Sequence, residues 1–317
     1  MGLLSLTDCS KNEQGRKKEM IDKKKSKMYA NVPADQVNRF FAFRESHPHK
    51  QTTIDGVQWS YLDIGQGKIT LLLLTGALGT TESSWQTIDY LSGMEKGTRY
   101  RVIAPAYPAI PTATGLVDGI AAILDREGIA RIHLIGGSAG GAVAQVFIRR
   151  HADKTASMIL SHTLYPDPER GAKIAGALRW MALVPAFILR AIVLSRLSGL
   201  TTDRPELALT NAYLQEAMRY QLTKKDLLCL YRRTVDFDTR CTFTPHDLDN
   251  WPGSVLLMMS DDDPSTPQAA RTQLQALYPQ AQTHLFHGTG HLAAVLKKDE
   301  YYGLIDRFVQ SCSAAKH

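Results

Sequence analysis

The segment GGSAG at residues 136–140 restricts the fold of this chain more than any other feature. It directly follows the apolar run RIHLI at 131–135 and directly precedes a helical pattern over 139–150. So tight a turn between a strand and a helix admits only small residues two positions before and after its serine, which is itself strained. The segment therefore predicts a nucleophile elbow that exposes the Ser138 hydroxyl. The alternative is a glycine-rich turn that serves only packing.

Short apolar runs recur along the chain and predict strands that are buried on both faces of a sheet. They lie at 69–75, 101–104, 131–135, 156–161, 254–259 and, more weakly, 283–286, and an alternating hairpin strand lies at 57–64. Helical patterns separate these runs at 115–126, 139–150, 266–277 and 293–309. Strands that alternate with helices predict an α/β fold with a mostly parallel sheet covered on both faces.

The alternation stops in residues 163–250, which are helical in pattern and rich in Leu, Ala and Arg. A helical insertion of this size predicts a cap over the carboxyl edge of the sheet, where ligands of open α/β sheets bind. Residues 29–162 and 251–317 then form the core. Within the cap, Pro185 predicts a kink or a break between two helices.

The apolar residues of the cap bear on the substrate. One interpretation is that they line an apolar pocket together with Leu78 of the core, which would suit an ester with an aliphatic or aromatic acyl chain. The other interpretation is that they only pack the cap onto the sheet. The residues in question are Trp180, Met181, Leu183, Phe187 and Ile188.

The formal net charge of +6 is concentrated at one end of the chain. Residues 11–27 hold eight Lys or Arg and three acidic residues, so this segment carries +5 and the rest is nearly neutral. We expect residues 1–28 to form a basic, disordered tail that is solvated, with a contact to anionic lipid or RNA as the alternative. The distribution does not predict a nucleic-acid partner.

Cysteine usage and apolar segments bear on location. The four cysteines are widely spaced and form no CxxC pair, which favours free thiols in a reducing compartment. They are Cys9, Cys229, Cys241 and Cys312. The uncharged apolar run at 180–189 is too short to span a bilayer, and the apolar stretch at 3–6 is shorter than the core of a signal peptide. These features predict a cytoplasmic protein without a transmembrane span.

A serine nucleophile needs a base and a group that orients the base. When the nucleophile lies in such an elbow, the acid and the histidine follow it in that order along the chain. The strand predicted at 254–259 leads into Asp261, Asp262 and Asp263. Asp263 has the best spacing, since it lies just before the turn that begins at Pro264. Asp262 is the alternative, and Asp261 is interpreted as a solvated turn residue.

The segment His287-Gly288-Thr289-Gly290-His291 follows the last predicted strand and leads into a helix. This position favours His291 as the general base, and Gly290 allows the loop to pass close to the elbow. We expect His287 and His284 to lie at the surface or at a strand end.

The transition state of acyl transfer carries an oxyanion, which backbone N–H groups can stabilise. Ala139 follows the nucleophile at a helix N-terminus and can supply one such group. The loop Thr75-Gly76-Ala77-Leu78-Gly79 can supply the other, with Ala77 the first candidate and Leu78 the second. The alternative is that this loop is only a glycine-rich turn. The chain carries no zinc or dinucleotide signature, so no metal and no cofactor are expected.

From about residue 52 to residue 309 the sequence resembles the α/β-hydrolase superfamily, and within it the maspardin-like branch. RVIA at 101–104 followed by Tyr107-Pro108, LVPAFIL at 183–189 and LYP at 277–279 carry the likeness to the branch. The resemblance implies a Ser-Asp-His hydrolase fold. The namesake of the branch lacks the complete triad and is regarded as a binding protein, which would imply a protein partner.

This chain departs from the branch by keeping His291 in a Gly-His context, and that departure favours catalysis. It departs from the superfamily by carrying Thr75 where the histidine of an HG motif usually stands, which bears on the oxyanion site.

We therefore predict an eight-stranded, mostly parallel sheet with flanking helices and a helical cap. The predicted activity is hydrolysis of a small, fairly apolar ester through an acyl-enzyme on Ser138, with His291 as base and Asp263 orienting it. Two alternatives stay open: a catalytically silent binding or adaptor protein, and a C–C bond hydrolase that uses the same triad.

Overall fold

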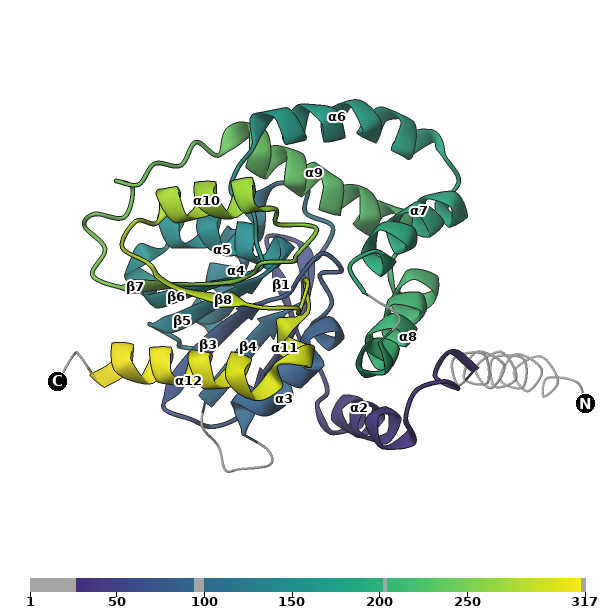
Figure 1. Cartoon of the computed structure of the whole chain (residues 1–317), viewed down its shortest axis with the longest axis horizontal. Helices are drawn as coiled ribbons and strands as arrows, with labels where there is room; N and C mark the ends of the chain where they lie inside the picture. Colours follow the sequence, from purple (N-terminus) through teal and green to yellow (C-terminus); the bar gives the residue numbers. More distant parts are fainter. Residues whose placement is uncertain (1–26, 94–99, 202–203, 315–317) are drawn as a thin grey trace, which may run out of the picture.

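The computed structural model describes residues 27–93, 100–201 and 204–314, and the predicted basic tail lies almost wholly outside them. Within these ranges the chain forms one eight-stranded sheet in the order β1-β2-β4-β3-β5-β6-β7-β8 (Figure 1). β1 and β2 pair antiparallel with their neighbours, and all other pairs are parallel. The predicted eight-stranded, mostly parallel sheet is confirmed. The strands are β1 (Lys50–Ile54), β2 (Val57–Ile64), β3 (Ile69–Leu74), β4 (Tyr100–Pro105), β5 (Ile132–Gly137), β6 (Thr155–Ser161), β7 (Ser254–Ser260) and β8 (Gln282–Phe286).

Helices cover both faces of this sheet. One face is covered by α4 (Ala113–Arg126), α5 (Ala139–Arg150) and α10 (Gln268–Leu277) (Figure 1). The other is covered by α3 (Trp85–Ser92), α12 (Lys298–Ala314) and the short α11 (Ala293–Leu296). The single helix predicted over 293–309 is thus two helices. The helix is interrupted at Lys297, which caps α11 by donating its backbone N–H to the Ala293 carbonyl.

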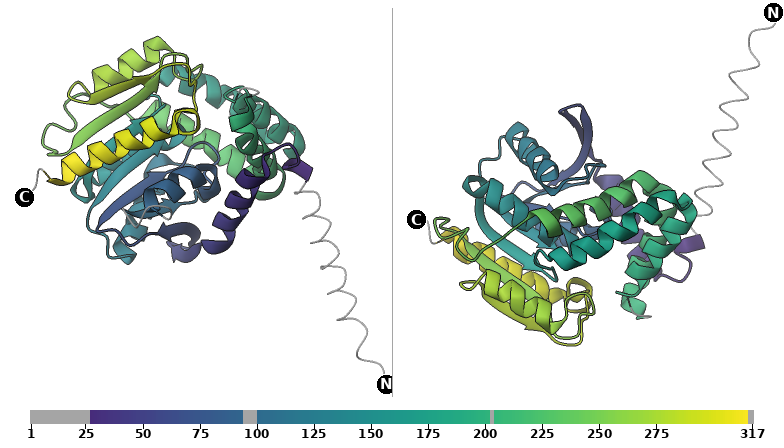
Figure 2. Two further views of the ribbon diagram at one scale, coloured as in Figure 1. Left: turned by 60° about the horizontal axis from the view of Figure 1, so that its bottom comes forward. Right: turned by 90° about the horizontal axis from the view of Figure 1, so that it is seen from above.

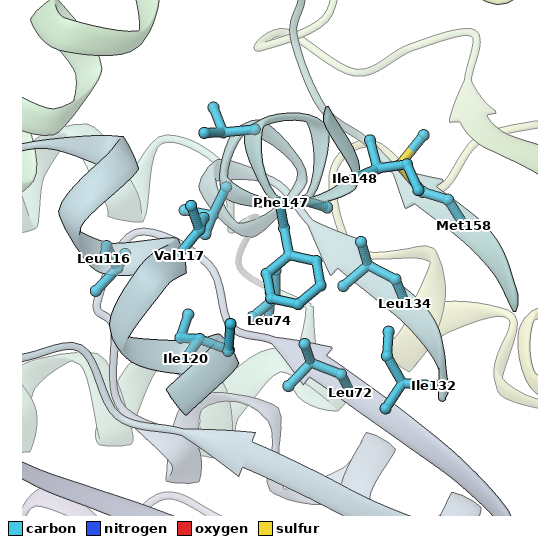
Figure 3. Close-up of a cluster of buried hydrophobic side chains, with 14 of the residues drawn as sticks. Leu72, Leu74, Leu116, Val117, Ile120, Ile132, Leu134, Phe147, Ile148 and Met158 are labelled. Carbon is cyan, nitrogen blue, oxygen red and sulfur yellow. The ribbon is translucent and has the colours of Figure 1, made fainter. Parts of the chain in front are cut away.

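Successive side chains of a strand point to opposite faces of the sheet. Because helices cover both faces, β3 carries apolar side chains on both. Leu72 and Leu74 point to the face covered by α4 and α5, whereas Leu71 and Leu73 point to the face covered by α3 and α12. On the first face, Leu72 and Leu74 meet Phe147 of α5 in the cluster drawn in Figure 3. This packing holds β3, β5 and α5 together, and these elements position the site.

Four helices between β6 and β7 form the cap, at one end of the sheet (Figure 2). They are α6 (Pro168–Leu183), α7 (Ala186–Ser198), α8 (Ala208–Glu216), continued by a π-helical turn (Ala217–Gln221), and α9 (Lys224–Arg240). Asp167 caps α6 by accepting bonds from the backbone N–H groups of Glu169 and Arg170, and a capping box begins α9 at Thr223. The predicted break at Pro185 is confirmed, because α6 ends at Leu183 and α7 begins at Ala186.

A buried ion pair ties the cap to α2 (Ala34–Ser46). Glu216 of α8 is only 1% exposed, and Arg44 of α2 donates to both of its carboxylate oxygens at 3.1 Å. The Tyr29 hydroxyl donates to the same carboxylate at 2.5 Å. Since a buried carboxylate without partners would be costly, these bonds fix α8 against the N-terminal side of the core.

Three cysteines within the described ranges, Cys229, Cys241 and Cys312, are free thiols, and Cys9 lies outside those ranges. The described part of the chain holds no helix that combines the length and the apolar character needed to cross a bilayer.

Candidate active site

Ser138 lies at the sharp turn between β5 and α5, at the carboxyl edge of the sheet. Its backbone has φ 53° and ψ −125°, a conformation that residues with a side chain rarely adopt. Three hydrogen bonds hold the turn: the Ser138 N–H donates to the Ser161 carbonyl at 2.9 Å, and the Ser138 carbonyl accepts from the Gly141 N–H at 2.9 Å and from the Thr163 hydroxyl at 2.7 Å. The local geometry is that of the predicted elbow.

Three of the glycines around Ser138 lie where neighbouring atoms leave no room for a side chain, whereas Gly137 has open space around it. A Cβ at Gly140 would lie 2.2 Å from the Leu74 carbonyl oxygen, and one at Gly136 would lie 2.6 Å from the Gly140 carbonyl oxygen. A Cβ at Gly141 would lie 2.5 Å from Thr163. α5 therefore starts in direct backbone contact with β3 and β5, and this contact fixes the direction in which the serine projects.

Asp263 and His291 meet beside this turn. The Nδ1 atom of His291 lies 2.8 Å from an Asp263 carboxylate oxygen, and the two side chains are 9% and 0% exposed. The Ser265 hydroxyl donates to Asp263 at 2.7 Å and lies 2.8 Å from the same His291 nitrogen. The Thr266 hydroxyl also donates to Asp263, at 2.8 Å.

Burial alone would raise the pKa of Asp263, but its hydrogen bonds and the charge of His291 outweigh burial and hold that pKa well below its usual range. The carboxylate is therefore ionised at neutral pH. It can fix the His291 ring and stabilise the imidazolium form.

The other acids and histidines of these two loops lie in different positions. Asp261 pairs with His287 at 2.6 Å, where the histidine side chain is 76% exposed. Asp262 accepts a bond from the Gly290 backbone N–H at 2.9 Å and so braces the histidine loop. His284 pairs with Glu300 at 2.8 Å. Of the three consecutive acids, only Asp263 contacts His291.

The loop after β3 lies against the serine. A Cβ at Gly76 would be 3.6 Å from the Ser138 Cβ, and Ala77 lines the same cavities as Ser138. Ala139 borders one of these cavities. This arrangement is compatible with the predicted pair of backbone donors. Thr75 is fully buried, and its hydroxyl has no hydrogen-bond partner within the described structure, whereas its carbonyl accepts a bond from Tyr107 at 2.9 Å.

Sequence reasoning missed His162, which is 4% exposed and borders both cavities beside Ser138. Its ring nitrogens lie 2.8 Å from the Ser161 hydroxyl and 2.7 Å from the Ser260 hydroxyl. Burial, with a smaller contribution from the His291 charge, lowers its pKa to about 3. His162 therefore stays neutral and braces β6 against β7. Its position directly after a buried strand was the signal that could have indicated it.

Two cavities meet at Ser138. The first, the α8 cavity, has a volume of about 230 Å³ and is bordered by His291 and by Leu209 and Tyr213 of α8. The second, the α9 cavity, has about 400 Å³ and is bordered by Leu230 and Phe237 of α9. Both are lined mainly by apolar residues, and Leu197 of α7 borders both. A ligand at Ser138 can therefore extend in two directions.

The residues proposed to line a pocket lie in different places. Leu78 borders the α8 cavity. Trp180 and Phe187 do not line either cavity, because they are 73% and 69% exposed on the outside of the cap. Met181 packs against the small apolar core of the cap. The later turns of α7 and the helices α8 and α9 line the cavities instead.

Ser138, Asp263 and His291 are thus brought to one edge of the sheet, and Ser138 and His291 border the same cavity. Within the described residues no hydrogen bond joins the Ser138 hydroxyl to His291. Such bonds are often long without substrate and shorten when it binds. No group of three or more His, Cys, Asp or Glu side chains in the described ranges is arranged to hold a metal ion.

Residues 71–301 match the model of the Alpha/beta hydrolase family, and the chain belongs to this family. Maspardin of Mus musculus is 28% identical over 257 residues, covering 78% of this chain and 78% of that protein. A proline iminopeptidase of Lactobacillus helveticus is 25% identical over 283 residues, covering 80% and 95%. A carboxylesterase structure from the ammonia-oxidizing thaumarchaeon Nitrososphaera gargenis superimposes with a TM-score of 0.66 at 19% identity, covering 84% of this chain and 100% of that one.

Proposed function

We propose that the protein is a serine hydrolase that cleaves the ester bond of a small, largely apolar substrate through Ser138, His291 and Asp263. The observation that carries this proposal is the contact of 2.8 Å between His291 and the buried, ionised Asp263, beside a serine held in a strained elbow. A packing turn would require neither the buried carboxylate nor the histidine.

In this mechanism Asp263 accepts the bond from Nδ1–H of His291, so Nε2 is free to take the proton of Ser138. The serine oxygen then attacks the ester carbonyl, and the backbone N–H groups of Ala77 and Ala139 stabilise the oxyanion. His291 returns the proton to the leaving alcohol, and a water molecule, activated by the same histidine, releases the acid from the acyl-enzyme.

The two cavities suggest how the substrate lies. The leaving oxygen must come within hydrogen-bond reach of His291, which borders only the α8 cavity. We therefore assign the alcohol part to the α8 cavity and the acyl part to the larger α9 cavity, which Ala139 borders. The volume of about 400 Å³ suits a medium-sized acyl chain.

A fluorophosphonate probe and a series of p-nitrophenyl esters of graded acyl length test the proposal. We expect the folded wild type to be labelled and to hydrolyse the esters. Ser138→Ala should abolish labelling and lower kcat by about 10⁴-fold or more, because loss of the nucleophile disables the whole triad. Its melting temperature should stay close to that of the wild type.

A catalytically silent binding protein is the second candidate, since maspardin is among the relatives. The departure at Thr75 and the absence of a hydrogen bond between Ser138 and His291 within the described residues are the observations that favour it. A folded wild type that is neither labelled nor active on any ester would support this role. Activity only on a ketone substrate with a cleavable C–C bond would instead support a C–C hydrolase.

A further inference from the structure

The junction of α6 and α7 carries a cluster of exposed apolar side chains. Trp180, Leu183 and Phe187 are 73%, 76% and 69% exposed, and Ile188 and Ile192 are each 38% exposed. We call these five residues the junction patch. Single exposed apolar residues are ordinary, but a group of large ones on a folded surface marks a contact with a partner or a membrane.

The junction patch lies at the outer end of the cap, away from the sheet (Figure 1). Helix α7 is apolar on both sides. Leu189 and Val193 are fully buried in the cap and Leu197 borders the cavities, whereas Phe187 and Ile192 face outward. The outward residues therefore contribute neither to the core of the cap nor to the cavities.

The segment that carries the junction patch has charged residues of one sign, although Arg170 is paired with Asp238 of α9. Residues 170–201 contain no Asp and no Glu, and their five basic residues are Arg170, Lys173, Arg179, Arg190 and Arg196. The patch itself lies within this segment. Lys224 adds a further cation at the junction, where it donates to the Ala182 carbonyl at 2.7 Å. The surface thus combines apolar side chains with cations and has no acid in the same segment.

We propose that the junction patch inserts into the interface of a membrane that contains anionic lipid. Trp favours the level of the headgroups, Leu and Phe reach the acyl boundary, and the long stems of Arg and Lys let their charges contact lipid phosphates. Each basic side chain near an anionic surface adds to the attraction. The chain attaches to one leaflet, since none of the helices described could span the bilayer.

A second copy of this chain fits the patch less well. A symmetric contact brings the same surface of both copies together, so two acid-free segments would face one another, each with four cations besides the paired Arg170. Like charges at a contact oppose association, whereas an anionic lipid surface complements them.

The position of α7 links this contact to the cavities. Its first turns carry Phe187 and Ile192 toward the membrane, and its last turns carry Leu197 to the edge of both cavities. If the proposed hydrolase activity holds, apolar esters dissolved in the membrane are the substrate class that this arrangement would admit. The membrane contact itself does not depend on catalysis.

Sedimentation of the full chain with lipid vesicles tests the proposal. We expect binding to phosphatidylcholine vesicles that contain about 30% phosphatidylserine, and weaker binding to phosphatidylcholine alone. Leu183→Ser and Phe187→Ser should each lower the partition coefficient about tenfold, because each removes one inserted side chain. Arg179→Gln should lower binding about fivefold, and only to the anionic vesicles.

Leu285→Ser is the matched control, since Leu285 is also exposed, at 41%, but lies on β8 away from the cap. It should bind vesicles as the wild type does. Fluorescence gives an independent readout. Trp59 and Trp85 are buried, and Trp251 is half-buried and donates to the Thr155 carbonyl. Insertion of the exposed Trp180 should therefore shift the emission to shorter wavelength, and Trp180→Phe should remove that shift.

Failure to bind anionic vesicles would overturn the proposal. So would binding that Leu183→Ser and Phe187→Ser leave unchanged, because the contact would then lie elsewhere in the chain. Self-association that these substitutions abolish, in a chain that does not bind vesicles, would assign the patch to a second copy. Repeating sedimentation with Ser138→Ala separates this proposal from the hydrolase: loss of esterase activity with retained vesicle binding leaves the membrane contact standing.

Discussion

The carboxyl edge of the sheet and the helical cap are built on different principles. At the carboxyl edge, loops from β3, β5, β7 and β8 are fixed by short hydrogen bonds and by backbone contacts that exclude side chains. The cap has a small apolar core formed by Leu189, Val193, Met218, Leu222 and Leu227, and it leaves larger apolar side chains exposed on its outside. The edge thus holds its side chains in fixed positions, whereas the cap depends less on exact packing.

The first test of this comparison replaces one carboxylate oxygen at the carboxyl edge of the sheet. Asp263→Asn should lower kcat by about 10³–10⁴-fold, because the amide favours the wrong tautomer of His291. Asp262→Asn should have only a small effect, since Asp262 contacts the Gly290 backbone and not the ring. His291→Ala should remove activity, and His287→Ala should retain most of it. Steady-state kinetics on one ester decide among these; equal losses in Asp262→Asn and Asp263→Asn would refute the assignment.

The second test removes the same side chain from each region. Leu134 in β5 and Leu189 in α7 are both fully buried. Leu134→Ala should lower the free energy of unfolding by about 3–5 kcal/mol, since the close-packed sheet cannot fill the cavity. Leu189→Ala should cost about 1–3 kcal/mol, because the cap has few layers and can collapse around the gap.

Denaturant unfolding measures both variants in the same buffer. If Leu189→Ala lowered the free energy of unfolding as much as Leu134→Ala, the cap would be packed as tightly as the core. The two regions would then not differ in the way proposed.

The third test measures how the stability of the protein changes as the pH is lowered. Burial lowers the pKa of His162 to about 3 and that of His133 in β5 to about 4, both below the ordinary value of 6.5. The unfolded chain therefore binds more protons between these values, and stability falls as pH drops below about 6.5. At pH 5 His162 alone should cost about 2 kcal/mol relative to pH 7. Melting curves over this range, with His162→Asn as the flatter control, measure the effect; a pH-independent wild type would contradict it.

The sequence was most informative where the geometry of the candidate site depends on residues that are neighbours along the chain. The elbow was predictable because its glycines, its serine and the flanking strand and helix are contiguous. Asp263 and His291 were predictable from their places after successive strands. His162 was not, because a lone histidine gives no sign that its ring will lie between the hydroxyl of its neighbour Ser161 and that of Ser260, 98 residues further along the chain.

The cap illustrates the opposite case. The extent of the cap follows from its composition, and the break between its first two helices follows from Pro185. The side that faces the cavities does not follow, because α7 has apolar residues all around its circumference. We predicted that Trp180 and Phe187 face inward, and the structure places them outside. Helix α2 was also missed, since Phe40 and Phe43 are buried by contacts with α3 and α8 that no local pattern specifies.

The tie between α2 and α8 has a consequence for synthesis on the ribosome. Arg44 and its partner Glu216 are 172 residues apart, so the N-terminal helix emerges long before the acid that it pairs with. Until α8 has been translated, Arg44 and the aromatic side chains beside it lack their final contacts. Domains that close late in this way expose apolar surface during translation. The N-terminal side of the core can therefore complete its packing only after the cap has been synthesised.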